Sequence, residues 1–298
     1  MIQPRGLDHL IHLVRDLDAA EDAYERLGFS VGRENHHPFG TKNRIIQFPG
    51  VFIELLAIGD HAPIPEHAPQ VFSFAAFHRD LLARSGEGGS GVAFESRNAQ
   101  ADADSFRKAG LGDHAPFHFE RRGFTHDGRE THVAFDLVFA VDLLAPDLCV
   151  FACEHAFPEN FWNEAAQHHA NGATGVAAVE LTAENPSDHQ LLLSAATGVR
   201  DFRASSSGLF IETPRGRVEA LTPEAFARST GAGAAPRDGL GFSGLRVAVE
   251  DLDLAAEAID GLGGHVERRG DRLVASPAGT FGLVLSFEAR RPDSGGLR

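Results

Sequence analysis

The sequence contains an internal repeat, which restricts the possible folds of this chain more than any other feature does. The segment VEDLDLAAEAIDGLGG, beginning at Val249, aligns without a gap on VRDLDAAEDAYERLGF, beginning at Val14. Apolar residues recur at helical spacing in both segments: Leu17, Ala20, Tyr24 and Leu27 in the first, and Leu252, Ala255, Ile259 and Leu262 in the second. Because the two segments agree both in the signal for the start of a helix and in the helical spacing of apolar residues, we predict that the chain is built from repeated structural units.

The first copy of the unit, residues 7–58, predicts one strand, one helix and three further strands. Residues 7–14 are apolar, Asp16 is a suitable helix cap and Gly28 a suitable helix stop. The last run of the unit, VFIELLAI, places Glu54 inside an otherwise apolar strand. A buried carboxylate requires a partner, and His9 in the first strand is the natural candidate.

Two weaker copies of the unit lie between these segments and begin at Gly91 and Gly175. The alignments place His9 of the first unit on Gly91, Val179 and Gly244, so that four units of similar size fill the chain. A chain of 298 residues exceeds the usual size of a single hydrophobic core. We therefore predict two domains, residues 1–156 and 172–289, with a connector over 157–171 and a tail over 290–298.

The composition is that of an ordinary globular protein with a strong negative charge. A formal net charge of −15 argues against nucleic acids and anionic membranes as partners. No signal peptide or membrane span is recognisable. Cys149 and Cys153 lie four residues apart in one expected strand, too distant to bridge, and we interpret them as reduced core residues of a cytoplasmic protein. The expected partner is a small-molecule substrate, and a homodimer is compatible with the sequence.

The chain resembles the vicinal oxygen chelate superfamily and, more narrowly, the larger glyoxalase-like proteins of bacteria. The segments LDHLIHLVRDLDAAEDAYERLGF and FIELLAI of the first unit carry the broader resemblance. The narrower resemblance rests on two segments. GTKN is similar to the family's GTxN. CEH followed by HHANGA is similar to the family's CQH…HPNGA, with Glu154 in place of Gln and Ala170 in place of Pro. The resemblance implies an α+β fold in which four βαβββ units pair into two cupped mixed-sheet domains.

In this superfamily, metal ligands come from the first and fourth strands of two facing units, so the resemblance places His9 and Glu54 on a metal ion. The facing unit has Gly91 at its first-strand position, so only its fourth strand can contribute, through Glu154 or His155. Successive strand residues face opposite sides, and we favour Glu154 because the family usually has Glu or Gln there. The expected cofactor is one divalent ion, zinc, nickel, iron or manganese, held by His9, Glu54 and Glu154.

Further candidates for substrate binding are His37, Thr41 and Asn43, which lie between strands where a loop at the mouth of a cup would hold a ligand, together with His155. The second half offers no comparable set of ligands. Glu219 aligns with Glu54, but Val179, Gly244 and the pair Leu285 and Ser286 occupy the other ligand positions. We therefore expect the first domain alone to carry the metal ion.

Three functions are compatible with these residues. The leading hypothesis is a metal-dependent lyase or isomerase that forms an enolate of a small oxygenated substrate, with Glu54 or Glu154 moving the proton. The second is an Fe(II) extradiol-type ring-cleavage dioxygenase, which needs two histidines and one carboxylate, and therefore an inward-facing His155, His118 or His132. The third is a metal-free protein that binds or sequesters a small molecule.

Overall fold

The computed structural model describes residues 3–124 and 130–290, and within them the four predicted units are present. The first unit comprises β1 (Leu7–Leu13), α1 (Leu17–Arg26), β2 (Asn35–His36), β3 (Thr41–Phe48) and β4 (Val51–Ile58). The second comprises β5 (Gly88–Glu95), α3 (Ala99–Lys108), β6 (Phe117–Phe124), β7 (Glu130–Ala140) and β8 (Cys149–His155). The predicted βαβββ order is confirmed in both.

The third and fourth units repeat this order. The third comprises β9 (Ala173–Thr182), α5 (Gln190–Thr197), β10 (Arg203–Ser205), β11 (Gly208–Glu212) and β12 (Arg217–Leu221). The fourth comprises β13 (Gly241–Val249), α7 (Leu252–Gly261), β14 (Glu267–Arg269), β15 (Arg272–Ala275) and β16 (Val284–Ala289). Between the units lie α2 (Phe74–Ser85), α4 (Pro158–Phe161), α6 (Pro223–Thr230) and the 3₁₀ turn Glu164–Gln167. A second 3₁₀ turn, Pro186–His189, precedes α5 within the third unit.

The repeated helix start has the same atomic basis in the first and fourth units. Asp16 accepts hydrogen bonds from the backbone amides of residues 18 and 19, at 3.0 and 3.2 Å. Asp251 accepts them from residues 253 and 254, at 2.7 and 3.1 Å. Such caps satisfy amides that have no partner within the helix. Tyr24 and Ile259, which the repeat aligns, are both fully buried.

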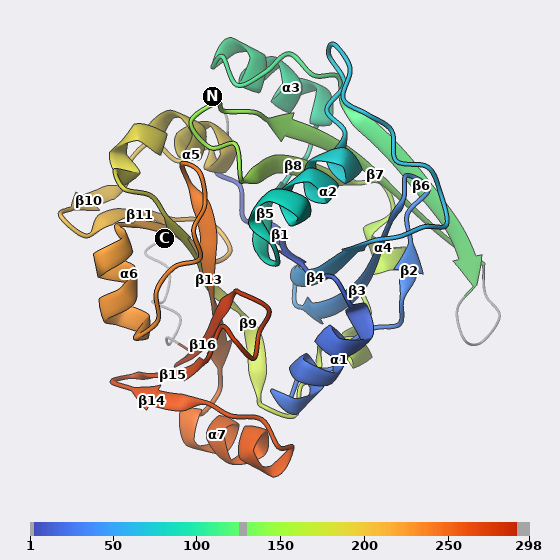
Figure 1. Ribbon diagram of the computed structural model, residues 1–298. Coiled ribbons are helices and arrows are strands. Elements are labelled where there is room, and N and C mark those ends of the chain that lie inside the picture. Colours follow the sequence, from blue (N-terminus) through green and yellow to red (C-terminus); the bar gives the residue numbers. More distant parts are fainter. Residues whose placement is uncertain (1–2, 125–129, 291–298) are drawn as a thin grey trace, which may run out of the picture.

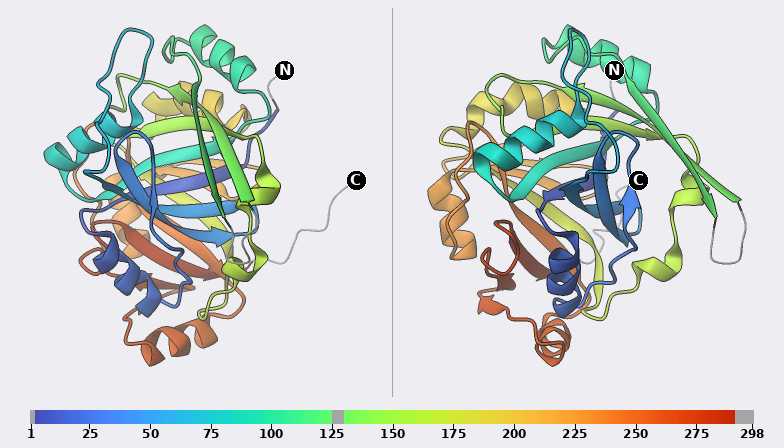
Figure 2. Two further views of the ribbon diagram at one scale, coloured as in Figure 1. Left: turned by 90° about the vertical axis from the view of Figure 1, so that its right-hand side faces the viewer. Right: turned by 45° about the vertical axis from the view of Figure 1, so that its right-hand side comes forward.

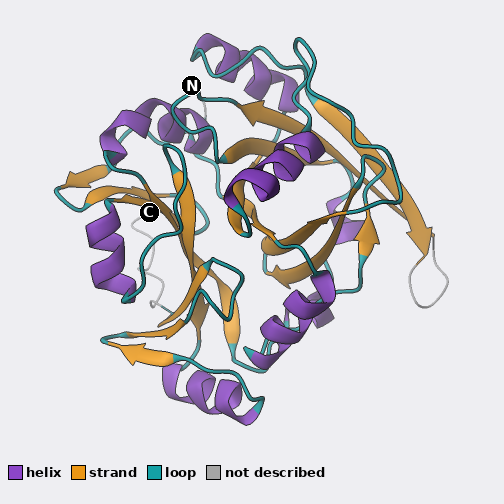
Figure 3. Cartoon of the chain, in the orientation of Figure 1, coloured by secondary structure: helices purple, strands orange, loops and turns teal. Residues whose placement is uncertain are grey.

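The strands form two curved halves, visible in Figures 1 and 3 as two groups of strands with most helices at the periphery. In the first half the strand order is β2-β3-β4-β1-β5-β8-β7-β6, and in the second it is β10-β11-β12-β9-β13-β16-β15-β14. Within each unit the first strand pairs in parallel with the fourth. The mixed sheets of an α+β glyoxalase-like fold are therefore confirmed. Residues 291–298 of the predicted tail lie outside the described residues.

The two halves share one sheet and one core. Phe242 of β13 pairs with Gly89 of β5, and a Cβ on Gly89 would lie 2.4 Å from the Phe242 ring. The largest hydrophobic cluster includes residues from all four units, and the ring of Phe29 stacks on that of Phe287 with centroids 5.9 Å apart. Figure 2 shows the two groups of strands in contact from two further directions. The predicted domain boundary falls in the α4 segment and remains a prediction.

Arginine side chains reinforce the junction between the halves, which we call the seam. Each guanidinium donates to backbone carbonyls of the other half: Arg5 to Ala195 and Ala196 at 3.0 Å, Arg215 to Leu7 at 2.9 Å, and Arg237 to Ser85 at 2.9 Å and Glu87 at 3.1 Å.

None of the described helices is long and apolar enough to cross a membrane.

Candidate functional site

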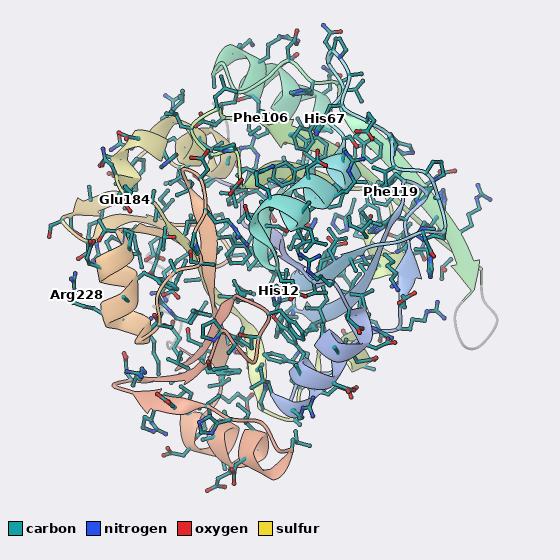
Figure 4. The ribbon with its side chains drawn as sticks, in the orientation of Figure 1. His12, His67, Phe106, Phe119, Glu184 and Arg228 are labelled. Atoms are coloured by element: carbon teal, nitrogen blue, oxygen red, sulfur yellow. The ribbon has the colours of Figure 1, made fainter. Side chains whose placement is uncertain are left out.

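The first half contains a partly open cavity that is lined mainly by phenylalanine rings. Its free volume is about 40 Å³, which is room for about three water molecules. The polar lining is supplied by His9, His37, Asn43, Glu54 and Arg121. The apolar lining includes Phe39, Phe52, Phe74, Phe119, Phe135, Phe151 and Phe161. Phe119 is labelled in Figure 4, on the side of the molecule formed by β6 and β7. A few polar groups in an apolar cavity are typical of a small-molecule site.

A β-bulge at the start of β1 brings two neighbouring side chains into the interior of the first half. Leu7 pairs with Phe94 and His9 with Ala93, which leaves Asp8 as the extra residue of β1. An extra residue of this kind breaks the alternation of side chains along a strand. The carboxylate of Asp8 therefore lies 2.6 Å from Nδ1 of His9, whose ring stacks on Phe52. Asp8 was not among the residues predicted from the sequence.

Glu54 lies beside His9, as predicted, on the neighbouring strand β4. Its Oε2 is 3.8 Å from Nε2 of His9, and its Oε1 accepts a 2.6 Å hydrogen bond from Nδ2 of Asn43. Burial raises the pKa of the Glu54 carboxyl, and the opposing effects of His9 and Asn43 do not cancel it. Glu54 is thus a carboxyl group whose affinity for a proton exceeds the ordinary one, which suits a group that transfers protons near neutral pH.

The predicted substrate residues His37, Thr41 and Asn43 are brought together next to Glu54. Nδ1 of His37 is 2.8 Å from the hydroxyl of Thr41, and Nε2 is 3.2 Å from Nδ2 of Asn43. Burial, followed by the nearby guanidinium of Arg121, lowers the pKa of His37 to about 3. His37 and Asn43 line the cavity, whereas Thr41 lies behind His37. All three are buried, and Thr41 and Asn43 lie in strand β3 rather than in the loop between strands that we expected.

Contrary to expectation, the side chain of Glu154 does not lie beside His9 and Glu54; which residues bind a metal ion stays a prediction. Oε2 of Glu154 accepts a 2.7 Å hydrogen bond from the backbone amide of Ala99, at the start of α3. The alternation along β8 therefore places His155 in the interior of the first half, where its ring stacks with Trp162 at 6.0 Å. The pairing of the strands explains why Glu154 lies elsewhere. In the first unit, Ile11 of β1 pairs with Glu54 of β4. In the second unit, the repeat aligns Ala93 of β5 with Ile11, and Ala93 pairs with Phe151 of β8. The counterpart of Glu54 in the second unit is thus apolar.

His155 joins the site through Asp8. Its Nε2 is 3.1 Å from Oδ2 of Asp8, and Sγ of Cys153 completes a trio whose potential ligand atoms all lie within 4.8 Å of one another. No other trio of this kind occurs among the described residues. Burial raises the pKa of Asp8, but the charges and hydrogen bonds of His155 and His9 outweigh it, and the net pKa is lowered. Burial raises the pKa of Cys153, which keeps it a thiol.

The other two histidines considered for an oxygenase site lie elsewhere. His118 pairs with Asp136 at 3.0 Å and His132 with Glu120 at 2.9 Å, and neither lines the cavity. His12, which is fully buried, lies near the middle of the molecule in Figure 4 and bonds to the hydroxyl of Tyr24 on α1. Of the histidines on β1, only His9 belongs to the site.

The second half holds an ion network, which we call the Arg246 network, at the position of a metal site. Arg246 forms a bidentate pair with Glu219 at 2.9 and 3.1 Å and also bonds to Glu180 and, at 3.3 Å, to Glu288. Its side chain is only 2% exposed. Arg217 and Arg272 bond to Glu288 and Glu180 from outside. A permanent cation therefore neutralises the carboxylates of this half.

Comparison with known proteins decides the family. The profile described as "Glyoxalase-like domain" matches residues 7–197, more than half of the chain. The chain belongs to this family of glyoxalase-like domains. With its fold, this membership also confirms the vicinal oxygen chelate superfamily. No curated protein gives a significant sequence match.

Solved structures support the fold of this glyoxalase-like protein at low sequence identity. A hypothetical protein from Staphylococcus aureus is 12% identical, with a TM-score of 0.67 over 96% of this chain and 100% of that one. A xylose isomerase-like TIM barrel/4-hydroxyphenylpyruvate dioxygenase fusion protein is 12% identical, with a TM-score of 0.57 over 99% of this chain and 50% of that one. A mutant of 4-hydroxymandelate synthase from Streptomyces coelicolor is 12% identical, with a TM-score of 0.53 over 99% and 95%.

Proposed function

We propose that this glyoxalase-like protein is a metal-dependent enzyme that moves a proton on a small oxygenated substrate, as a lyase or isomerase. The observation that carries the proposal is the hydrogen bond between Asp8 and Nδ1 of His9. Because Nδ1 donates to the carboxylate, Nε2 keeps its lone pair, and this atom faces Glu54 across 3.8 Å. A histidine that binds a metal ion commonly donates its other ring N–H to a carboxylate, which fixes the orientation of the ring.

The donor set fits a divalent ion with an incomplete protein shell. Imidazole and carboxylate suit zinc, nickel, iron and manganese, and two ligands at about 2 Å from a common point can span the 3.8 Å between Nε2 and Oε2. Such an ion, when bound, polarises the oxygen atoms of a chelating substrate. The remaining positions are free for those oxygens because Glu154 points away and His155 is bonded to Asp8.

The side chains around this position have separable roles in the proposal. Glu54, whose carboxylate lines the cavity beside His9, accepts the proton from the carbon next to the substrate carbonyl and returns it. Asn43 holds the carboxylate through its 2.6 Å hydrogen bond, and neutral His37 fixes Asn43 from the other side. The phenylalanine rings exclude water from the reacting carbon. We also propose that the first half alone carries the ion, because Arg246 fills the corresponding place in the second.

Metal content of matched variants tests the site. We expect His9→Ala and Glu54→Gln each to abolish tight binding of zinc, nickel, iron or manganese, measured on dialysed protein by elemental analysis. Asp8→Asn should weaken binding by about 10- to 100-fold, because it removes only the support of His9. Glu154→Gln, a carboxylate change on the other face of β8, is the control and should retain full metal. A folded His9→Ala protein with an undiminished metal content would contradict the proposal.

Proton transfer is tested directly by exchange. Small ketones, aldehydes and oxo acids incubated with metal-loaded protein in D₂O should lose the NMR signal of the hydrogen next to the carbonyl. Glu54→Gln, which loses the metal ion together with the proton-accepting carboxylate, should lower the rate by at least about 100-fold. Absence of exchange across the whole panel would exclude this reaction class.

One observation favours a second candidate, the oxygenase. An oxygenase of this type needs two histidines and one carboxylate. His155 faces the interior and would be the second histidine beside His9 and Glu54, although its Nε2 is bonded to Asp8. Oxygen uptake by the iron-loaded protein in the presence of catechols distinguishes the two candidates. A protein that binds no metal but does bind small molecules would instead belong to the sequestering type.

A further inference from the structure

Arg121 of β6 is a charged group in the cavity that has no partner of its own. Its Nε is buried and has no hydrogen-bond partner, and among the described residues no carboxylate lies within 4.0 Å of the guanidinium. Arg121 nevertheless lines the same cavity as His9 and Glu54. A partly buried guanidinium without a carboxylate partner can bind the carboxylate of a ligand that enters the cavity.

We propose that the natural ligand of this cavity is a small carboxylic acid of two to three carbons with a neighbouring oxo or hydroxyl oxygen, and that Arg121 binds its carboxylate. This inference rests on the proposed function, because it names the substrate class of the same site. Arginine suits a carboxylate because its planar fork can donate two parallel hydrogen bonds. The chelating oxygens of the acid would then face His9 and Glu54.

The charges around Arg121 leave its positive charge available. Glu54 attracts it, but Oε1 of Glu54 already accepts a hydrogen bond from Asn43. Burial and the nearby positive charge of Arg33 both lower the pKa of Arg121. A carboxylate ligand beside Arg121 would offset both unfavourable effects.

The walls of the cavity limit the size of the ligand. The free volume of about 40 Å³ and the surrounding rings of Phe119, Phe135 and Phe161 admit only a few non-hydrogen atoms. Phe119 lies two residues before Arg121 on β6 and therefore faces the same side of the strand. Larger aromatic acids would require these rings to move. Among acids with adjacent oxygens, compact ones require the smallest displacement of these rings.

Binding of acids and their neutral amides tests this inference. We would titrate glycolate, lactate and pyruvate, each against its amide, into the full-length protein by calorimetry, with and without added zinc. The acids should bind about 10- to 100-fold more tightly than the amides. Arg121→Gln should abolish this difference, Arg121→Lys should retain part of it, and Arg97→Gln, which changes an exposed arginine, should leave it unchanged.

The outcomes separate this inference from the proposed function. Equal binding of acids and amides, or an acid preference that survives in a folded Arg121→Gln protein, overturns the role of Arg121 whatever the metal content is. An Arg121-dependent preference for acids in a protein that retains no metal supports the inference and overturns the proposed metal site. Thermal unfolding of each variant establishes that it is folded before its binding is compared.

Discussion

Replacing Arg246 by methionine is expected to destabilise the protein by about 3–5 kcal/mol. The substitution removes the central cation of the Arg246 network and leaves Glu180 and Glu219, which are 0% and 7% exposed, without their shared partner. Glu180 keeps only Arg272 and Glu219 keeps only Arg217 at 3.8 Å, and the burial of carboxylates with too little counter-charge makes this effect large. Urea unfolding at pH 8 measures it as a fall in the midpoint at an unchanged slope.

Compensating substitutions distinguish this cause from a packing defect. In an Arg246→Met background, Glu180→Gln and Glu219→Gln should recover most of the lost stability, because amides need no counter-charge. In the wild-type background the same two substitutions should destabilise. An Arg246→Met protein within about 1 kcal/mol of the wild type would show that the network contributes nothing to folding.

The stability of the protein is also expected to fall between pH 6.5 and pH 4 through His12 and His78. Burial lowers the pKa of each histidine from 6.5 to about 4. In this range the unfolded chain binds more protons than the folded one, so acid favours unfolding, while above pH 6.5 the effect is absent. At pH 5 each histidine should cost about 2 kcal/mol relative to pH 8.

Substitution of one histidine measures its share. His78 bonds to the carbonyl of Phe74 at 2.7 Å, and its Nε2 is buried without a partner, so His78→Leu removes the titrating group from an apolar site. The difference in unfolding free energy between pH 8 and pH 5 should shrink by about 2 kcal/mol in this variant. His36→Gln, at an exposed position, should leave the difference unchanged. An unaltered difference in His78→Leu would assign the acid sensitivity to other groups.

The fold was predictable from the sequence because its signals are local. Asp16 and Asp251 cap their helices within three residues, and the buried positions of the two helices follow the helical period. Such signals survive in a repeat even where strand residues differ. The proximity of His9 and Glu54 was also predictable, since a buried carboxylate in an apolar strand needs a partner on the neighbouring strand, whereas their role as metal ligands stays a prediction.

The remaining site residues depend on strand register, which the sequence does not determine. The bulge at Asp8 moves this residue into the interior, and in β9 a bulge at Ala177 shifts the alignment by one residue. Val179, which the repeat aligned with His9, therefore packs in the large core, whereas Glu180 binds Arg246. In β8 the run CVFACEH is apolar at both alternating sets of positions, so it gave no basis for choosing His155 over Glu154.

The seam between β5 and β13 determines how a ligand can reach the cavity. Many two-domain enzymes admit their substrates by swinging one domain away from the other about a flexible connection. Here Gly89 and Phe242 are joined within a continuous sheet, and the core behind them is shared. Hinge opening would break that core, so we expect a ligand to enter the cavity without separation of the two halves. Phe119 and Arg121 of β6 line the cavity, and substitutions in this strand, rather than at the seam, should change the rates of binding and release.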